Sequence, residues 1–375
     1  MRVLGTRIGL TCMALIYSLT AYGQGDWAIF ETFSRNAPAV YSISVEIPQE
    51  HIIKSYEDSI KRLNEYQENL TEDIFGGSGK NAGNSMLFEN MINRIEKHLK
   101  IYVNQLMSNN YLRGAGFAID NEHLVTLSTV VRSATLGGEI TLMDDHSQRL
   151  KANLLGLDET TGIAVLKVED ASFSTYVDVT RISGMLPIAS YIMTIQRPYD
   201  LHASPFSGMI GGYYRTVGLF EYERYIQADL PLFPGNDGAP VFSPSGQLIG
   251  MLATEYHREG WPGISFIIPG DMVLDSAREI IANGTIEHGW IPGIEFKQDI
   301  SGIIIEKLEE TSPAKMAGLQ KGDIITGFNG QRVNQGVDLI YYILNARPNE
   351  LVQVEIQRGT QRIVIPIKTS KRTEG

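Results

Sequence analysis

Short hydrophobic runs separated by polar turns dominate the middle of the chain. They lie between Gly114 and about Ile268 and are rich in β-branched side chains. Runs of this length, bounded by turn residues at short intervals, are typical of the strands of an all-β domain. The pattern predicts a pair of β-barrels here. Its clearest runs are Phe117–Ile119, Leu124–Leu127, Ile140–Met143, Ile163–Val168 and Gln247–Leu252.

A different pattern precedes the β-rich region. After a strand candidate at Ala37–Glu46, apolar residues recur at spacings of three and four, as on one face of a helix. A glycine-rich break at 76–84 divides them into two sets. The spacing predicts a helical insertion over about 48–110, either a helical hairpin or a partly disordered segment. The two sets are Ile52, Ile53, Tyr56, Ile60, Leu63 and Leu70, then Phe88, Met91, Ile92, Ile95, Leu99, Tyr102 and Leu106.

The C-terminal part mixes both periodicities. A helix is predicted at about Asp271–Ala282, and Asn283-Gly284 is a helix stop signal that we take as a domain boundary. Further helices are predicted where Ser312 precedes Pro313 and at Asp338–Ala346. A smaller α+β domain is therefore expected to follow the β-rich one. Its strand signals are a hairpin turn at Asn329-Gly330 and the alternation of Val352, Val354 and Ile356 with polar residues.

The N-terminal residues 1–23 have the layout of a secretory signal peptide. Arg2 and Arg7 precede an uncharged apolar run at 8–21, and Ala21 and Gly23 supply small residues for cleavage. An uncleaved membrane anchor is the alternative, although the run is shorter than the ~20 residues that span a bilayer. Cleavage would remove two arginines and no acidic residue from a chain of formal charge −11, leaving −13.

Composition excludes several classes of function. The acidic balance and the lack of a concentrated basic patch argue against nucleic acid or an anionic membrane as partner. The one cysteine, Cys12, lies inside the signal segment, so the mature chain offers no thiol nucleophile, disulfide or thiolate ligand. The seven histidines are scattered without metal-binding spacing. We expect no metal and no cofactor.

Several segments resemble the HtrA/Deg family of exported serine proteases. Asn36–Glu46 is similar to that family's first strand, and Gly114–Asp120 to its GSGF-I-D segment. Ile226–Asp229 resembles IQTD, Pro234–Pro240 resembles the PGNSGGP stretch around the nucleophile, and Gly263–Pro269 resembles G-I-G-F-A-I-P. The resemblance covers nearly the whole mature chain.

The resemblance implies a fold and a location. The expected fold is a mostly β, trypsin-like double six-stranded β-barrel over 24–285, carrying the helical insertion, and an α+β PDZ domain over 286–370. The PDZ expectation rests on Ser312–Ala314, Ala317–Ile325 and Asn329-Gly330, which resemble the SPA-x-x-AGL-x-x-GD-x-I…NG signature. Family membership also implies the bacterial periplasm.

The family's catalytic positions carry residues unsuited to its chemistry. A serine protease needs a hydroxyl nucleophile, an imidazole base and an orienting carboxylate. Matching Thr126–Val131 to T-N-x-H-V-V puts Thr129 at the histidine, and matching Asp158–Lys167 to D-x-x-T-D-I-A-L-L-K puts Gly162 at the aspartate. Asp237 stands at the nucleophile, where its charge would oppose the oxyanion donors, the N–H groups of Gly235 and Asp237.

A relocated catalytic site is the alternative. His123, His146, His202 and His257 lie in regions that resemble turns or surface loops of the family, so we expect them to be solvated loop residues. The sequence therefore predicts a pseudoprotease, in which no catalytic residue is expected.

For the PDZ domain the resemblance implies that an extended peptide adds to an exposed strand while loop N–H groups hold its carboxylate. The family's loop usually reads Y/W-hydrophobic-Gly-hydrophobic, and here Pro292 is inserted into it. Because proline has no N–H, the loop loses one donor for the carboxylate. A PDZ domain used only for packing within an oligomer is the alternative. The implied peptide-binding residues are Ile291, Pro292, Gly293 and Ile294 of the loop that starts at Trp290, then Phe296 on the strand and Leu339 and Ile343 on the flanking helix.

The leading hypothesis is an exported, non-catalytic protein that binds polypeptide segments or protein C-termini, as a scaffold, a chaperone-like holder or a regulator of an active paralogue. One alternative is an active HtrA-type serine endopeptidase in protein quality control. The other is a structural subunit of a homo-oligomer assembled through the helical insertion. No membrane contact is expected unless the signal segment stays uncleaved.

Overall fold

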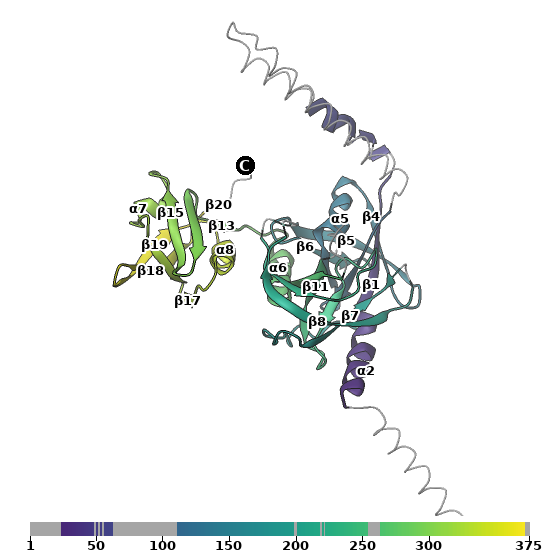
Figure 1. The fold of residues 1–375 in the computed structure, drawn as a ribbon. Helices are drawn as coiled ribbons and strands as arrows, with labels where there is room; N and C mark the ends of the chain where they lie inside the picture. Colours follow the sequence, from purple (N-terminus) through teal and green to yellow (C-terminus); the bar gives the residue numbers. More distant parts are fainter. Residues whose placement is uncertain are drawn as a thin grey trace, which may run out of the picture. The chain divides into compact units, whose positions relative to one another are not determined.

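The computed structural model describes residues 24–48, 50–51, 53–54, 56–62, 111–198, 201–217, 220, 222–253 and 263–371. The chain divides into two compact units, a pair of β-barrels and a smaller α+β unit (Figure 1). Of the predicted helical insertion, the described residues between 50 and 62 are helical. The predicted signal segment and the rest of the insertion, from 63 to 110, lie outside the described residues.

The first described element is a helix that the sequence did not predict. Helix α2 (Gln24–Asn36) leads through a 3-10 turn, η1 (Ala37–Ala39), into strand β1 (Val40–Glu46). On α2 the polar Thr32 and Asn36 are buried while the aromatic Trp27 and Phe30 are more than half exposed, at 52% and 56%. The hydrophobic pattern gives no clear helix signal here, because the two most buried side chains are polar and two aromatic side chains are exposed.

The strand predicted at Ala37–Glu46 starts three residues late. Pro38 stands in the first turn of η1, where its fixed φ and missing N–H suit a helical turn better than a strand. β1 therefore begins at Val40, and its first three residues are buried.

The first barrel closes around β1, which pairs with β2 on one side and β4 on the other. Its strand order is β1-β2-β3-β6-β5-β4. Helix α5 (Ser128–Val131) follows β3 directly. The strands are β2 (Tyr111–Ala118), β3 (His123–Leu127), β4 (Glu139–Met143), β5 (Arg149–Asp158) and β6 (Ile163–Val168).

The second barrel has the order β10-β11-β12-β9-β8-β7 and closes through pairing of β10 with β7. Every residue of β10, β11 and β12 is buried, which explains why these strands read as continuous apolar runs. Helix α6 (Gly270–Asn283) follows, and Gly284 ends it at φ +74°, as predicted. The strands are β7 (Tyr191–Gln196), β8 (Ser204–Arg215), β9 (Tyr225–Ala228), β10 (Pro240–Phe242), β11 (Leu248–Ala253) and β12 (Ser265–Pro269).

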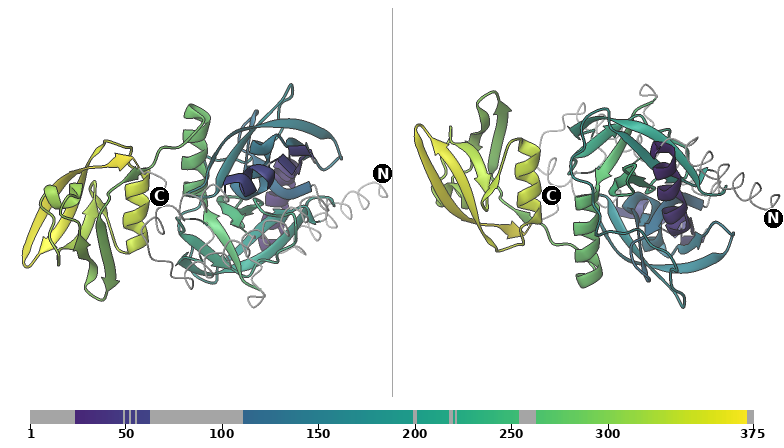
Figure 2. Two further views of the ribbon diagram at one scale, coloured as in Figure 1. Left: turned by 90° about the horizontal axis from the view of Figure 1, so that it is seen from above. Right: turned by 90° about the horizontal axis from the view of Figure 1, so that it is seen from below.

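The smaller unit is a sheet in the order β14-β15-β16-β18-β19, with the short β17 paired to β16. Helix α8 (Gly336–Asn345) lies beside this sheet (Figure 2). The short pair β13·β20 and helix α7 (Pro313–Met316) complete it. The strands are β13 (Gly289–Trp290), β14 (Ile294–Asp299), β15 (Gly302–Leu308), β16 (Ile324–Phe328), β17 (Gln331–Arg332), β18 (Leu351–Arg358), β19 (Gln361–Lys368) and β20 (Ser370–Lys371).

Local signals in this unit acted as the sequence predicted. The Ser312 hydroxyl accepts the N–H of Lys315 at 3.2 Å and so caps α7. Asn329 and Gly330 both have positive φ, +48° and +77°, in the turn between β16 and β17. The predicted fold class, two six-stranded barrels followed by an α+β domain, is confirmed.

Within the described ranges, no helix has the length and apolar character that crossing a bilayer requires. The same ranges contain no group of three or more His, Cys, Asp or Glu side chains arranged to hold a metal ion.

Candidate functional site

Backbone contacts link the segments that carry the three predicted triad positions. Thr129 lies on α5, and the N–H of its neighbour Ser128 donates to the carbonyl of Gly162 at 2.8 Å. The N–H of Ala115 on β2 donates to the carbonyl of Asp237 at 2.7 Å. A Cβ on Gly114 would meet Val130, the residue after Thr129, and the Asp237 carbonyl, so β2 passes between them without a side chain.

The groups at these positions are a hydroxyl, a hydrogen atom and a carboxylate. Thr129 and Asp237 are half-buried, and Gly162 is buried with φ +77°. None of them is a proton acceptor of the kind an imidazole supplies near neutral pH. Gly162 has no side chain that could orient a base, and the left-handed conformation of its backbone favours glycine.

Two glycines with positive φ shape the turn around Asp237. Gly235 has φ +85° and Gly238 has φ +92°. Gly238 packs so closely on the Ala115 carbonyl that an added Cβ would lie 2.2 Å from its oxygen. The N–H of Gly238 donates to the Leu252 carbonyl at 2.9 Å, which ties the turn to β11.

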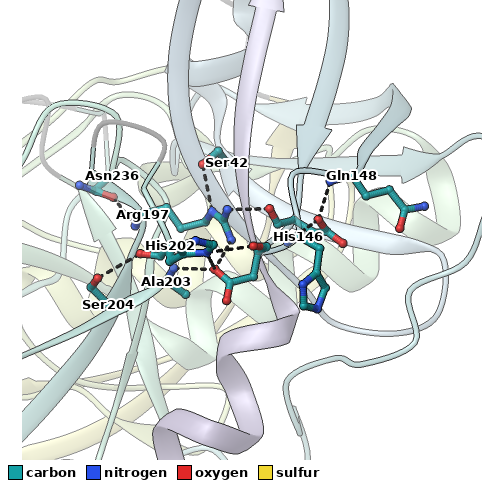
Figure 3. Close-up of polar contacts among 10 residues, drawn as sticks. Ser42, His146, Gln148, Arg197, His202, Ala203, Ser204 and Asn236 are labelled. Atoms are coloured by element: carbon teal, nitrogen blue, oxygen red, sulfur yellow. Dashed lines mark hydrogen bonds and ion pairs between the residues drawn. The ribbon is translucent and has the colours of Figure 1, made fainter.

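Arg197 contacts this turn through its main chain, and no sequence pattern predicted its role. It follows β7 directly, and its main-chain N–H donates to Asn236 Oδ1 at 2.9 Å. Its side chain is only 2% exposed and crosses to the first barrel, where Nε donates to Ser42 Oγ at 3.2 Å (Figure 3). Two further bonds go to the β4–β5 turn, to the Asp145 carboxylate at 3.1 Å and to the Asp144 carbonyl at 2.6 Å.

The buried Arg197 guanidinium has the Asp145 carboxylate as its ion-pair partner. Asp145 Oδ1 also accepts the N–H of Ala203, so the same carboxylate holds the segment that leads into β8. Tyr41 lies close to this cluster: burial, and then the charge of Asp144, raise the pKa of its phenol to about 12, against the opposing effect of Arg197.

Three of the four histidines considered for a relocated site lie in described segments. His123, the first residue of β3, pairs with Asp120 at 2.8 Å, and its ring is largely covered rather than fully solvated as expected. His146 lies exposed in the β4–β5 turn, and the His202 ring is 84% exposed beside the Asp145 carbonyl. His257 lies outside the described residues.

The predicted peptide-binding loop leads into an edge strand. Ile291 is buried, and Pro292, Gly293 and Ile294 are half-buried, with Gly293 at φ +69°. Ile294 begins β14, which lies at the end of the strand order and pairs with β15 on one side. β14 therefore has the position that addition of a peptide strand requires.

Helix α8 packs against β14. The predicted residues Leu339 and Ile343 are 2% and 5% exposed and pack in the core of the unit with Ile291. The Gln298 side chain on β14 reaches the start of α8 and accepts the N–H of Gly336 at 2.9 Å. The half-buried Phe296 ring lies against the same glycine, 3.1 Å from where a Cβ would stand. Gln298 was not predicted, because its role depends on the spacing between strand and helix.

Two family models match the chain. One described as a trypsin-like peptidase domain matches residues 114–251, and one described as a PDZ domain matches residues 292–369. The chain belongs to the HtrA family of trypsin-fold proteins with a PDZ domain. It spans about half the length of the curated relatives it matches.

Two of these relatives carry the same name, probable periplasmic serine endoprotease DegP-like. The protein from Pseudomonas savastanoi pv. phaseolicola is 29% identical over 262 residues, covering 66% of this chain and 54% of the relative. The protein from Rhizobium meliloti is 28% identical over 261 residues, covering 66% and 51%. In line with these names, the expected exported, periplasmic location is confirmed.

Solved HtrA structures share the fold. The HtrA-type protease AlgW with tripeptide has a TM-score of 0.64 at 20% identity, covering 92% of this chain and 98% of that one. The serine endoprotease from Yersinia pestis has a TM-score of 0.54 at 20% identity, with the same coverage. At this identity the likeness concerns the fold alone.

Proposed function

We propose that this protein is a non-catalytic member of the HtrA family that binds polypeptide segments through its PDZ domain. One observation supports the proposal: the positions that match the family's triad motifs hold Thr129, Gly162 and Asp237, in segments linked by backbone hydrogen bonds. A scaffold that retains its geometry while lacking the reacting groups is suited to binding rather than to bond cleavage.

The chemical case is one of missing steps. Attack on a peptide carbonyl needs a hydroxyl whose proton passes to a base, and the negative oxygen that forms needs N–H donors. Asp237 offers a carboxylate in place of the hydroxyl, and its charge opposes the charge that would develop on the oxyanion. Removal of triad members leaves a residual rate of only ~10³ to 10⁴ over water in active proteases, and this added charge lowers it further.

The binding case rests on β14. It is an edge strand that packs on the apolar core of the unit. The hydrogen bond from the Gly336 N–H to the Gln298 side chain ties it to the start of α8. A groove whose walls are already tied together loses little conformational entropy when a strand is added. The AlgW structures named with a tripeptide and a decapeptide support peptide binding as the function to test in this chain.

Active endopeptidase function is the rival, favoured by the names of the curated relatives. Incubation with a fluorescent fluorophosphonate and with casein separates the two: we expect neither covalent labelling nor turnover. Labelling of any serine beside Asp237 would overturn the proposal. Peptides captured from a periplasmic extract by the full chain, and lost when 286–370 is deleted, would support binding through the PDZ domain.

A structural role in an oligomer is a further alternative, because the amphipathic pattern over 48–110 needs a surface to cover it. Mass photometry of the full chain and of a variant lacking Gln49–Asn109 tests it. Dissociation on deletion, together with unchanged peptide binding, would assign the two functions to different parts of the chain.

A further inference from the structure

A negative charge lies against the loop that should receive a ligand's C-terminus. The Glu309 N–H donates to the Gly293 carbonyl at 2.8 Å, which fixes the end of β15 to the loop. The Glu309 side chain then folds against the same residue: its Oε2 lies 2.8 Å, and its Cβ 2.9 Å, from where a Cβ on Gly293 would stand. Only glycine fits there, and a carboxylate is thereby held against the loop.

The lysines near this carboxylate are engaged elsewhere. Lys307 pairs with Glu295 at 2.7 Å and Lys315 lies 3.6 Å from Glu310. The pKa of Lys307 is raised chiefly by Glu295, with a smaller effect from Glu309. Within the described part of the chain no cation lies within ion-pair distance of Glu309, so its charge is only partly offset.

The loop is also short of donors. Capture of a peptide carboxylate relies on successive main-chain N–H groups that converge on it. Pro292, immediately before Gly293, contributes none. A free carboxylate entering this loop would therefore find one donor fewer than a loop without proline would offer. It would also be repelled by the Glu309 carboxylate, whereas an uncharged peptide bond would not.

We propose that this PDZ groove selects internal, extended polypeptide segments and discriminates against free C-termini. This inference rests on the proposed peptide-binding function and specifies its ligand class. The segment pairs with the free edge of β14, and an uncharged peptide bond lies at the loop formed by Pro292 and Gly293. Specificity arises from a repulsive element, the Glu309 carboxylate, as well as from attractive contacts.

Paired peptides test the inference on the full chain. Fluorescein-labelled ten-residue peptides ending in Val, Leu or Phe are made as free acids and as C-terminal amides, the amide standing for the continuing chain. Fluorescence anisotropy at low salt should give an affinity roughly tenfold higher for the amide of a pair, as expected of two carboxylates a few ångströms apart. Higher salt should reduce the difference in affinity between the amide and the free acid.

Two variants assign the cause. Glu309→Gln keeps the backbone bond to Gly293 and should bring acid and amide affinities to within about twofold of each other. Glu310→Gln is the matched control. The Glu310 side chain is 86% exposed and lies near Lys315, so this variant should keep the wild-type preference for amides over free acids.

The possible outcomes distinguish the selectivity for internal segments from the proposed peptide-binding function. Equal affinities, or tighter binding of the free acids, would overturn the selectivity while leaving peptide binding intact. An amide preference that survives in Glu309→Gln would overturn the role of Glu309. Failure of every peptide to bind, in either form, would overturn the proposed function and the inference with it.

Discussion

The main-chain N–H of Arg197 donates to Asn236 Oδ1 at 2.9 Å, one residue before Asp237, the predicted nucleophile position. The side chain of the same arginine is bonded to Ser42 and to the Asp144–Asp145 turn of the first barrel. One residue thus holds the Asp237 turn and links the two barrels. These contacts maintain the geometry of this turn.

Arg197→Met should lower the free energy of unfolding by about 2–4 kcal/mol, because it removes the cation that pairs with a partly buried carboxylate and leaves two other acceptors without their donor. The main-chain bond to Asn236 remains. Urea denaturation measures the loss. Ser42→Ala, which removes one of these bonds, should lose about 1 kcal/mol.

Arg278→Met is the matched control. Arg278 forms a surface ion pair with Asp275, at 3.0 Å and well exposed, so its loss should change stability by less than about 0.5 kcal/mol. If Arg197→Met were no more destabilising than this control, the inter-barrel role of Arg197 would be wrong.

Local signals made much of the fold predictable. The Asn329-Gly330 turn, the Ser312 cap and the alternation of Val352, Val354 and Ile356 each depend on neighbours in sequence, and the structure places all of them as expected. The triad positions stay a prediction that rests on flanking motifs.

Features that depend on distant partners gave no such signal. Helix α2 buries Thr32 and leaves Trp27 exposed because a barrel loop accepts a hydrogen bond from the threonine hydroxyl, through the Pro244 carbonyl. Glu309 and Gly293 meet only because β15 returns beside β14. Which polar residue faces inward, and which charge faces a loop, is decided by tertiary contacts that periodicity does not record.

Restoring the triad tests whether only side chains are missing. Thr129→His, Gly162→Asp and Asp237→Ser together should permit fluorophosphonate labelling at position 237, whereas the wild type should show none. The Gly162 substitution should also lower stability by about 1–3 kcal/mol, because that residue has φ +77°. In-gel fluorescence and thermal denaturation measure the two effects.

The control for that experiment keeps the first two substitutions and carries Asp237→Ala, and it should remain unlabelled. Labelling of the triple variant elsewhere than position 237 would show that the scaffold no longer positions the nucleophile turn for attack.

Tyr41 should make stability fall at alkaline pH. Burial, followed by the charge of Asp144, raises its pKa from 10.0 to about 12 in the folded protein. A group with a raised folded pKa adds stability that is complete below the unfolded value and is lost as pH rises through the folded one. Tyr41→Phe should therefore lose less stability than the wild type between pH 10 and pH 12.

Urea denaturation at pH 8, 10 and 11 gives the comparison. Tyr191→Phe, at a side chain 63% exposed, should follow the wild-type curve. Parallel curves for Tyr41→Phe and the wild type would contradict the assignment.

Gln298→Ala tests whether the groove is organised before a peptide arrives. The substitution removes the acceptor for the Gly336 N–H and frees the start of α8 from β14. Because a looser groove must be ordered on binding, peptide affinity should fall about fivefold, or about 1 kcal/mol, while the fold of the unit stays intact.

A matched glutamine on the same sheet provides the comparison. Gln357 is exposed and its amide donates to the Gly359 carbonyl two residues away, so Gln357→Ala should leave peptide affinity unchanged. Both variants are measured by anisotropy with the peptide that binds the wild type best, and by thermal denaturation. Equal losses of affinity in the two would mean that the Gln298–Gly336 bond plays no part in binding, since only one of the two side chains spans from β14 to α8.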